Sequence, residues 1–327
     1  MTARRPLRRV RAAALCAVTV LAAGVVAGCG LSSAGPDVSP GSLADAADLT
    51  GRTYVVGSKN FDEQILLCHI TIAALQSANA SVTDRCDTGG SDVTRRALQS
   101  GDISIYWEYT GTAWASFLRQ TRKLPEPQLL TALRHEDEQR NGILWLQPAG
   151  FDNTYAFTVA GTTAARLNLR TLDDMAAYVR ANKPGTVCVE TEYSSREDGL
   201  RGLQKAYGFT LPPGRSEVLD AGLIYQSTAD GVCLFGEVGT SDGRIPGLGL
   251  KVLADDRGYH GTYKAVPTIR KDVYDQDPDV AKVLDPIASA LDYPTILALN
   301  EKVSAQGQDP RTVAREWLAQ RGFTGSE

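Results

Sequence analysis

Residues 52–78 have the sequence RTYVVGSKNFDEQILLCHITIAALQSA, and this stretch decides the fold class. Its first six residues form a short apolar, β-branched run that ends at Gly57, which is typical of a strand in a parallel sheet. From Phe61 to Ala78, apolar side chains recur every three or four residues, as in a helix that covers a sheet. A strand followed directly by a helix is the unit from which parallel sheets with helices on both faces are built.

The same alternation continues along the chain and then begins again. The predicted elements are strands over 82–85, 103–109, 186–190 and 232–235 and helices over 90–100 and 195–207. Ser195 is the expected N-cap of the last helix, with Glu197 and Asp198 in its first turn. The sequence therefore predicts an α/β protein with two lobes, each built on a parallel sheet.

Composition excludes several classes of protein. The chain has 327 residues, of which 43% are hydrophobic and 22% charged, so it is neither disordered nor a multi-span membrane protein. Its net charge is −4, but five of its basic residues are arginines among the first eleven positions. Without them, 29 basic residues face 38 acidic ones, a net charge of −9. A body this acidic argues against binding to nucleic acid, which requires a basic surface.

The N-terminal residues predict export. An uncharged run rich in Ala, Val and Leu follows the arginines and ends in LAAGVVAGC over 21–29. This run is short for a bilayer span and suits the apolar region of a signal peptide. Its end is similar to the box of bacterial lipoproteins, whose cysteine is diacylated. We therefore expect a signal peptide over 1–28, lipidation of Cys29 and a lipid-anchored tether over 29–50, which hold the protein on the outer face of the cytoplasmic membrane. An ordinary signal or an uncleaved anchor is the alternative.

Four cysteines remain beyond Cys29. An exported compartment permits disulfides, and four cysteines allow three pairings. We expect the pairs nearest in sequence, Cys68–Cys86 and Cys188–Cys233, because each closes a short loop inside one lobe. The alternative is a metal site, but the four cysteines include no C-x-x-C and have no histidine at ligand spacing, so we expect no metal.

Unusual chemistry follows three of the predicted strands. Gly57–Asn60, Glu108–Thr112 and Glu190–Arg196 each combine an aromatic or basic side chain with small hydroxyl residues. In α/β sheets, ligands bind at the carboxyl ends of the strands, beside helix N-termini. We therefore expect a ligand site at these three loops.

These loops carry a resemblance to a known family. The quoted motifs are G-S-K-N-F-x-E-Q-I-L (57–66), G-G-x-x-V-x-R-x-A-L (89–98), E-Y-T-G-T-A (108–113), N-T-Y-A (153–156), E-T-E-Y-x-S-R-x-D-G-L (190–200), Y-G-F (207–209), S-D-G-R-I (241–245) and L-x-D-D (253–256). In this order they resemble the substrate-binding lipoproteins of osmoprotectant ABC transporters, which recognise glycine betaine, choline, carnitine and proline betaine. The resemblance implies a bilobal periplasmic-binding-protein fold of type II with a two-strand hinge. Lobe 1 would comprise 51–156 and 264–327, and lobe 2 would comprise 157–263.

The ligands of that family make two demands on a site. A quaternary ammonium group donates no hydrogen bond and is held by aromatic faces, whereas a carboxylate needs cations and donors. By motif position, Tyr109 and Tyr155 are implied for the aromatic walls and Lys59, Thr112 and Arg196 for the carboxylate. Tyr225 is a further aromatic candidate, and Tyr263 and Tyr193 are weaker ones. Each has a structural alternative: core packing for the tyrosines, a solvated loop for Lys59, an ion pair for Arg196. Asp242 and Arg244 are more typical of turn structure.

Other functions are also open at this point. The family usually has an aromatic-proline-rich run where this chain has Tyr259–Tyr263, which leaves room for another small zwitterion or cation, such as an amino acid or a polyamine. A G-x-S-x-G match at 239–243 raises a remote alternative, an exported hydrolase using Ser241, but the breaker sequence after it does not suit a nucleophile elbow. The sequence has no G-x-x-x-x-G-K-[ST] motif. We expect no enzyme activity and no cofactor, and a monomer that works with a permease subunit and its ATPase.

Overall fold

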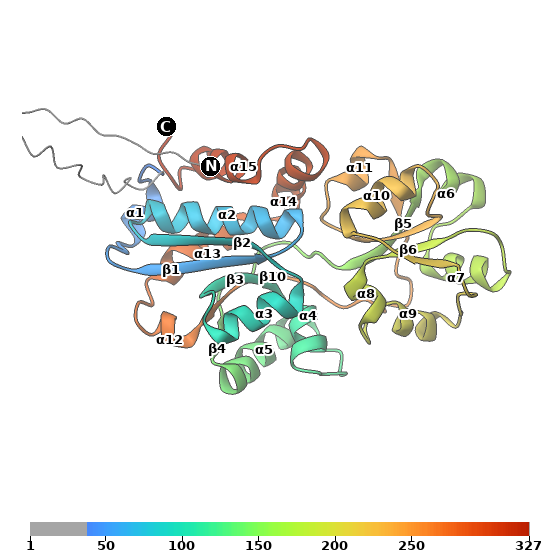
Figure 1. Ribbon diagram of the computed structural model, residues 1–327, viewed down its shortest axis with the longest axis horizontal. Coiled ribbons are helices and arrows are strands. Elements are labelled where there is room, and N and C mark those ends of the chain that lie inside the picture. Colours follow the sequence, from blue (N-terminus) through green and yellow to red (C-terminus); the bar gives the residue numbers. More distant parts are fainter. Residues whose placement is uncertain (1–37, 327) are drawn as a thin grey trace, which may run out of the picture. The chain divides into compact units, whose positions relative to one another are not determined.

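The computed structural model describes residues 38–326, which form two lobes that each carry a five-stranded sheet (Figure 1). The predicted signal peptide and Cys29 lie outside the described residues. Lobe 1 carries the sheet that contains the strand Thr53–Lys59, and lobe 2 carries the sheet that contains the strand Tyr155–Ala160. Among the described residues, no helix is both long enough and apolar enough to cross a membrane.

Lobe 1 is built from two separate stretches of the chain. Its sheet has the strand order β2-β1-β3-β10-β4. Its first stretch contains α1 (Ser42–Ala46), β1 (Thr53–Lys59), α2 (Asp62–Ser77), β2 (Ser81–Gly89), α3 (Ser91–Ser100), β3 (Ile105–Tyr109), α4 (Thr110–Thr112), the π-helix η1 (Ala113–Phe117), α5 (Glu126–Asn141) and β4 (Ile143–Trp145). Its second stretch contains β10 (Ala265–Arg270), α12 (Lys271–Tyr274), α13 (Val280–Ala290), α14 (Tyr293–Asn300), the π-helix η2 (Glu301–Ala305) and α15 (Pro310–Gln320).

Helix α2 forms the centre of the lobe 1 core. Most of its apolar side chains are buried, because it packs against the sheet and against α13, α14 and α15 (Figure 1). Strand β3 is buried along its whole length. The loops at the carboxyl ends of β1 and β3 are therefore held on a rigid layer.

Lobe 2 is a single stretch with the strand order β7-β6-β8-β5-β9. Its elements are β5 (Tyr155–Ala160), α6 (Gly161–Leu167), α7 (Leu172–Arg180), β6 (Val187–Val189), α8 (Thr191–Ser195), α9 (Leu200–Tyr207), β7 (Ser216–Val218), α10 (Ala221–Ala229), β8 (Phe235–Gly239), α11 (Arg244–Gly247) and β9 (Leu250–Val252). Helices α10 and α11 cover one face of the sheet, and α7, α8 and α9 cover the other (Figure 1). Tyr155 and Ala156, which the sequence predicts as the end of lobe 1, begin β5, an inner strand of this sheet that lies between β8 and β9.

The α/β class and the two lobes are as predicted, but the expectation of wholly parallel sheets is wrong. Strand β10 is antiparallel to β3 and β4, and β5 is antiparallel to β8 and β9. Both exceptions are strands that the chain enters directly from the other lobe. Such a strand begins at the edge where the parallel strands end, so it runs against them. The two crossing segments pair with each other through a bridge between Asp152 and Lys264.

The tether prediction is wrong for the described part of 29–50. Val38, Leu43 and Leu49 are buried in the lobe 1 core. The backbone N–H groups of Ser42 and Leu43 donate to the carbonyls of Gly322 and Phe323. The apolar residues in this Ser-, Pro- and Ala-rich stretch follow no helical or strand period, so their burial depends on the C-terminal segment that lies beside them.

The helix predicted over 195–207 is interrupted. Helix α8 ends at Ser195, and α9 begins only at Leu200. The carboxylate of Glu190 caps α8 by accepting the N–H groups of Glu192 and Tyr193, so Ser195 is not an N-cap. Arg196 has an extended backbone (φ −76°, ψ 149°) and lies in the loop between the two helices.

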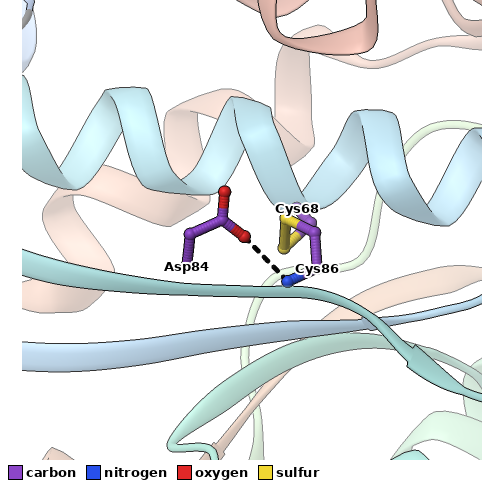
Figure 2. A group of neighbouring side chains, drawn as sticks. All are labelled: Cys68, Asp84 and Cys86. Atoms are coloured by element: carbon purple, nitrogen blue, oxygen red, sulfur yellow. Dashed lines mark hydrogen bonds between the residues drawn. A yellow bond between two sulfur atoms is a disulfide. The ribbon is translucent and has the colours of Figure 1, made fainter.

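Both short-range cysteine pairs are present as disulfides. Cys68–Cys86 joins α2 to β2, and Cys188–Cys233 joins β6 to the turn before β8. Asp84 lies beside the first disulfide and accepts a hydrogen bond of 2.8 Å from the N–H of Cys86 (Figure 2). Cys68, Asp84 and Cys86 lie close enough together to be considered as metal ligands. Because the sulfur atoms of the two cysteines are bonded to each other, neither offers a thiolate to a metal ion.

Candidate functional site

A cleft of about 660 Å³ is lined by residues of both lobes and of the crossing segments. It lies where the carboxyl ends of β1, β3, β6 and β8 meet, as expected for an α/β sheet. The side chains that form its aromatic and charged walls are Lys59, Phe61, Asp62, Glu63, Tyr109, Tyr155, Glu190, Glu192, Asp220, Tyr225, Glu237, Asp242, Arg244 and Tyr263.

The structure brings together the four tyrosines that the sequence singled out. Tyr109, Tyr155, Tyr225 and Tyr263 all line the cleft. The rings of Tyr155 and Tyr263 meet edge to face, with centroids 5.1 Å apart. Of the two weaker candidates, Tyr263 therefore lines the cleft and Tyr193 does not. Tyr193 is fully buried behind Tyr155, with 4.9 Å between the ring centroids.

Three of these rings each have a basic group of the protein beside them. Lys59 Nζ lies 5.0 Å from the Tyr109 ring centroid. The guanidinium carbon of Arg196 lies 5.6 Å from the centroid of Tyr155, and that of Arg244 lies 4.4 Å from the centroid of Tyr225. These are cation–π distances. Arg244, for which the sequence favoured a role in turn structure, is therefore part of the cleft wall.

The basic side chains also have acidic partners. Lys59 Nζ donates to Glu108 at 2.5 Å, with both side chains buried. Arg196 forms two hydrogen bonds with Asp198, of 2.8 and 2.6 Å, and a third of 3.3 Å with the hydroxyl of Thr112. Thr112 lines the main cleft, whereas Arg196 lines a smaller adjoining hollow. The three residues predicted to hold a carboxylate thus already have partners within the protein.

Glu63 connects the two lobes, and the sequence reasoning missed it as a site residue. It accepts hydrogen bonds from Tyr109 Oη, Asn153 Nδ2, Asn300 Nδ2 and Ser241 Oγ. Ser241 belongs to lobe 2 and the others to lobe 1 or a crossing segment. Burial raises the pKa of Glu63 above its ordinary range, and the four donors oppose that shift. Glu63 belongs to the motif quoted for residues 57–66, and that motif is the sequence signal that could have identified it as a site residue.

The contacts of Ser241 argue against the hydrolase alternative. Its hydroxyl donates to Glu63, a carboxylate with three further donors. The side chain of His260, the only histidine after Ser241 in the chain, contacts Tyr193 Oη (2.8 Å) and Asp255 instead. No serine–histidine pair is therefore formed at the G-x-S-x-G sequence.

Two carboxyl groups lie next to each other on the lobe 2 wall. Glu190 follows β6, Glu237 lies in the neighbouring strand β8, and the N–H of Glu190 donates to Glu237 at 3.0 Å. Burial, and then the charge of Glu190, raise the pKa of Glu237 to about 8. Burial also raises the pKa of Glu190. Glu237 was missed, although an acidic residue within the apolar strand FGEVG is itself a signal.

Side chains from one lobe also bond to the other beside the cleft. Glu192 of α8 accepts a hydrogen bond from the N–H of Ser91, the first residue of α3. Arg244 lies 3.2 Å from Asp62 of α2. Lys123 donates to the carbonyls of Gly258 and Tyr259. The two lobes are thus joined by polar contacts that an opening of the cleft would break.

Comparisons with known proteins agree with this geometry. Residues 52–320 match the OpuAC family model, the substrate binding domain of ABC-type glycine betaine transport system. The chain is 34% identical over 274 residues to the glycine-betaine-binding protein of Pseudomonas aeruginosa, which covers 82% of this chain and 87% of that protein. It is 31% identical over 274 residues to the ergothioneine transport permease/ergothioneine binding protein EgtU of Helicobacter pylori, with 83% of this chain and 48% of that one covered.

A solved structure shows the same architecture. Apo YehZ from Escherichia coli aligns with a TM-score of 0.63 and 29% identity, over 83% of this chain and 99% of that chain. The curated sequence of the same protein, glycine betaine-binding protein YehZ, is 31% identical over 280 residues, 82% of this chain and 90% of that one. The expected bilobal periplasmic-binding-protein fold is confirmed.

Proposed function

This chain belongs to the family of substrate-binding domains of ABC-type glycine betaine transport systems, and from this premise we propose that it captures a quaternary-ammonium osmoprotectant and delivers it to a permease. The class of ligand includes glycine betaine, choline, carnitine and proline betaine. The observation that carries the proposal is the cleft between two lobes with four tyrosines on its walls.

The aromatic wall suits such a ligand for a physical reason. A trimethylammonium group carries its charge on a surface without hydrogen-bond donors, so it is held by π faces, at about 0.5–2 kcal/mol per ring. Tyr109 and Tyr225 supply rings from lobes 1 and 2, and Tyr155 and Tyr263 supply rings at the two chain crossings. We assign all four to the ligand cage.

The predicted carboxylate contacts stay a prediction. A betaine carboxylate would be bound by Lys59, Thr112 and Arg196. To bind it, Lys59 would have to donate to the ligand as well as to Glu108, and Arg196 as well as to Asp198.

Capture works by closing the cleft without changing the ligand chemically. A ligand that touches both lobes stabilises the closed arrangement by the free energy of those added contacts. The bonds between Glu63 and Ser241 and between Glu192 and Ser91 belong to the same arrangement. The permease then recognises the two lobes together, and a separate ATPase subunit drives transport.

The N-terminal segment would keep the receptor near that permease. We propose that 1–28 direct export and that Cys29 carries the lipid, because two acyl chains suffice for stable anchoring. Anchoring raises the effective concentration of a monomeric receptor at its permease.

Isothermal titration tests the proposed function. We expect one ligand per protein from a panel of glycine betaine, choline, carnitine, proline betaine and ergothioneine, with proline, putrescine and an ester substrate as counter-tests. Tyr109→Ala should weaken binding at least about tenfold, Tyr109→Phe should keep most of the affinity, and Tyr274→Ala, a tyrosine of α12 away from the cleft, should have no effect. Binding of only the counter-ligands, or turnover of the ester that is lost in Ser241→Ala, would refute the proposal.

A further inference from the structure

The bases on the cleft wall, Lys59 and Arg244, are each paired with acidic groups of the protein. They therefore do not balance the other acidic side chains of the cleft. Lys59 lies 2.5 Å from Glu108. Arg244 lies 2.7 Å from Asp242 and 3.2 Å from Asp62. Neither base is available to an anionic group of a ligand without losing an existing ion pair.

The carboxyl groups of Glu190 and Glu237 have no such partner. Neither lies within ion-pair distance of a basic nitrogen in the described part of the chain. Arg196, whose charge acts on both, is engaged by two hydrogen bonds with Asp198. The lobe 2 wall therefore carries two carboxyl groups whose negative charge, once they are ionised, is compensated by no described base at ion-pair distance.

The position of Glu237 directs that charge into the cleft. The residue is 3% exposed, yet it lines the cleft. One of its oxygens accepts the N–H of Glu190, and the other has no hydrogen-bond partner among residues 38–326. Glu63, which is buried to a similar extent, has four donors. A carboxyl oxygen that is open to the cleft and has no partner among the described residues is a place for a group from outside the protein.

An aromatic face stands beside the two carboxyl groups. Tyr155 lines the same cleft, and its strand β5 pairs with β8, with Phe157 opposite Glu237. The charges of Glu190 and Glu237 both act on the Tyr155 hydroxyl. A ring next to a negative charge is the combination that binds an organic cation which donates no hydrogen bond.

The geometry points to Glu190 and Glu237 as a cation subsite that makes this cleft select a quaternary ammonium ion with a net positive charge over a zwitterionic betaine. The inference deepens the proposed function and rests on it. A choline-like ligand carries no group that these acidic side chains repel. The carboxylate of a betaine adds repulsion from acidic groups in a site of low dielectric, where charge interactions are strong.

Binding of such a cation is linked to a proton. Burial and then the charge of Glu190 raise the pKa of Glu237 to about 8, with a smaller contribution from Glu192, while the N–H of Glu190 and the charge of Arg196 lower it. The hydroxyls of Tyr155 and Tyr193 also face the charge of Glu237. At neutral pH Glu237 therefore holds a proton, which a bound cation displaces by favouring the ionised form. The affinity for the cation should rise with pH up to about pH 8 and then level off.

A comparison of choline with glycine betaine tests the inference, because both carry the same trimethylammonium group. The dissociation constants are measured by isothermal titration at about pH 6 and about pH 8.5, in buffers of different ionisation enthalpy, which report proton release. The variants are Glu237→Gln and Glu190→Gln. The control is Glu217→Gln, an exposed acidic residue of β7 on the same lobe. Thermal unfolding checks that each variant is folded.

We expect the wild-type protein to bind choline more tightly than betaine, with proton release near neutral pH. Glu237→Gln should weaken choline binding by about tenfold or more, weaken betaine binding far less, and abolish the proton release. If Glu237→Gln fails to fold, Glu190→Gln should give the same loss of preference. A preference for betaine, or a choline-to-betaine ratio unchanged in both variants, overturns this inference and leaves the proposed function intact. Binding of neither ligand nor of the other quaternary ammonium compounds overturns both.

Discussion

Lys59 Nζ lies 2.5 Å from Glu108 Oε1, and both side chains are buried, at 3% and 0% exposure. Glu108 also accepts hydrogen bonds from Tyr106 Oη and the N–H of Tyr109. The carboxylate thus holds a lysine, a neighbouring tyrosine and the end of β3 together under the cleft floor. The ammonium group of Lys59, at the end of β1, therefore stabilises lobe 1 through a buried ion pair.

Breaking this pair from one side should destabilise the protein. Lys59→Met leaves the Glu108 charge buried without a counter-ion, which costs about 3–5 kcal/mol of the free energy of unfolding. The double variant Lys59→Met/Glu108→Gln should recover a large part of that loss, because no charge is then buried alone. Urea unfolding of the two variants and the wild type measures both effects. Equal stability of the single and double variants would show that the charge pair is not the cause.

The contact between Glu192 and Ser91 should act on ligand release. The Glu192 carboxylate lies at the N-terminus of α3. There it accepts the N–H of Ser91, which has no partner within the helix, and it faces the positive end of the helix dipole. Glu192→Ala should lower ligand affinity by about tenfold, mainly through faster dissociation. Stopped-flow dissociation measures the rate. Glu197→Gln, an exposed acidic residue of the loop that follows α8, is the control and should release ligand at the wild-type rate.

Stability should fall as the pH rises through neutrality. The pKa of Glu237 is raised from its ordinary value of 4.5 to about 8, first by burial and then by the charge of Glu190. Between these two values the unfolded chain has lost a proton that the folded protein still holds. Folding is therefore favoured less with each increment of pH in that window, and the slope vanishes above about pH 8.

Glu237→Gln isolates this effect. Without the titrating group, the free energy of unfolding should vary less between about pH 5 and pH 8, and the variant should be the more stable protein at the upper end, by an amount on the order of a few kcal/mol. Urea unfolding without ligand at several pH values measures it. Glu217→Gln should keep the wild-type slope, and an equal slope in Glu237→Gln would contradict the assignment.

The two disulfides should differ in their contribution to stability. They close loops with sequence separations of 18 and 45 residues. By the loop-entropy relation, removal of Cys68–Cys86 should cost about 3 kcal/mol and removal of Cys188–Cys233 about 4 kcal/mol. Paired alanine variants compared by urea unfolding measure each contribution. A reductant should not lower the stability of the protein that lacks both bridges, which is the control for other effects of the reagent.

Local sequence patterns were enough to predict most of the helices and strands and part of the aromatic wall. The alternation of strand and helix follows from local periodicity, so β1, α2, β3 and the two-lobe α/β organisation were predictable. Tyr109 and Tyr155 were found because they stand in motifs, one at a strand end and the other at a chain crossing. Tyr225, which lies in α10, and Tyr263 stand outside those motifs. Periodicity failed where burial depended on a distant segment, as in residues 38–50 beside the C-terminus.

Which charged groups have an ion-pair partner depends on contacts between elements that are far apart in the sequence. Lys59 meets Glu108 across 49 residues of chain, and Glu63 meets Ser241 across 178. An ion pair or a hydrogen bond requires atoms within about 3 Å of each other, and spacing along the sequence does not report such distances between elements. The strand ends bring Glu190 and Glu237 together without a base at ion-pair distance in the part of the chain that the structure describes, whereas Lys59 and Arg244 have acidic partners. The sign of the charge that a ligand meets in this cleft is therefore a property of the folded molecule.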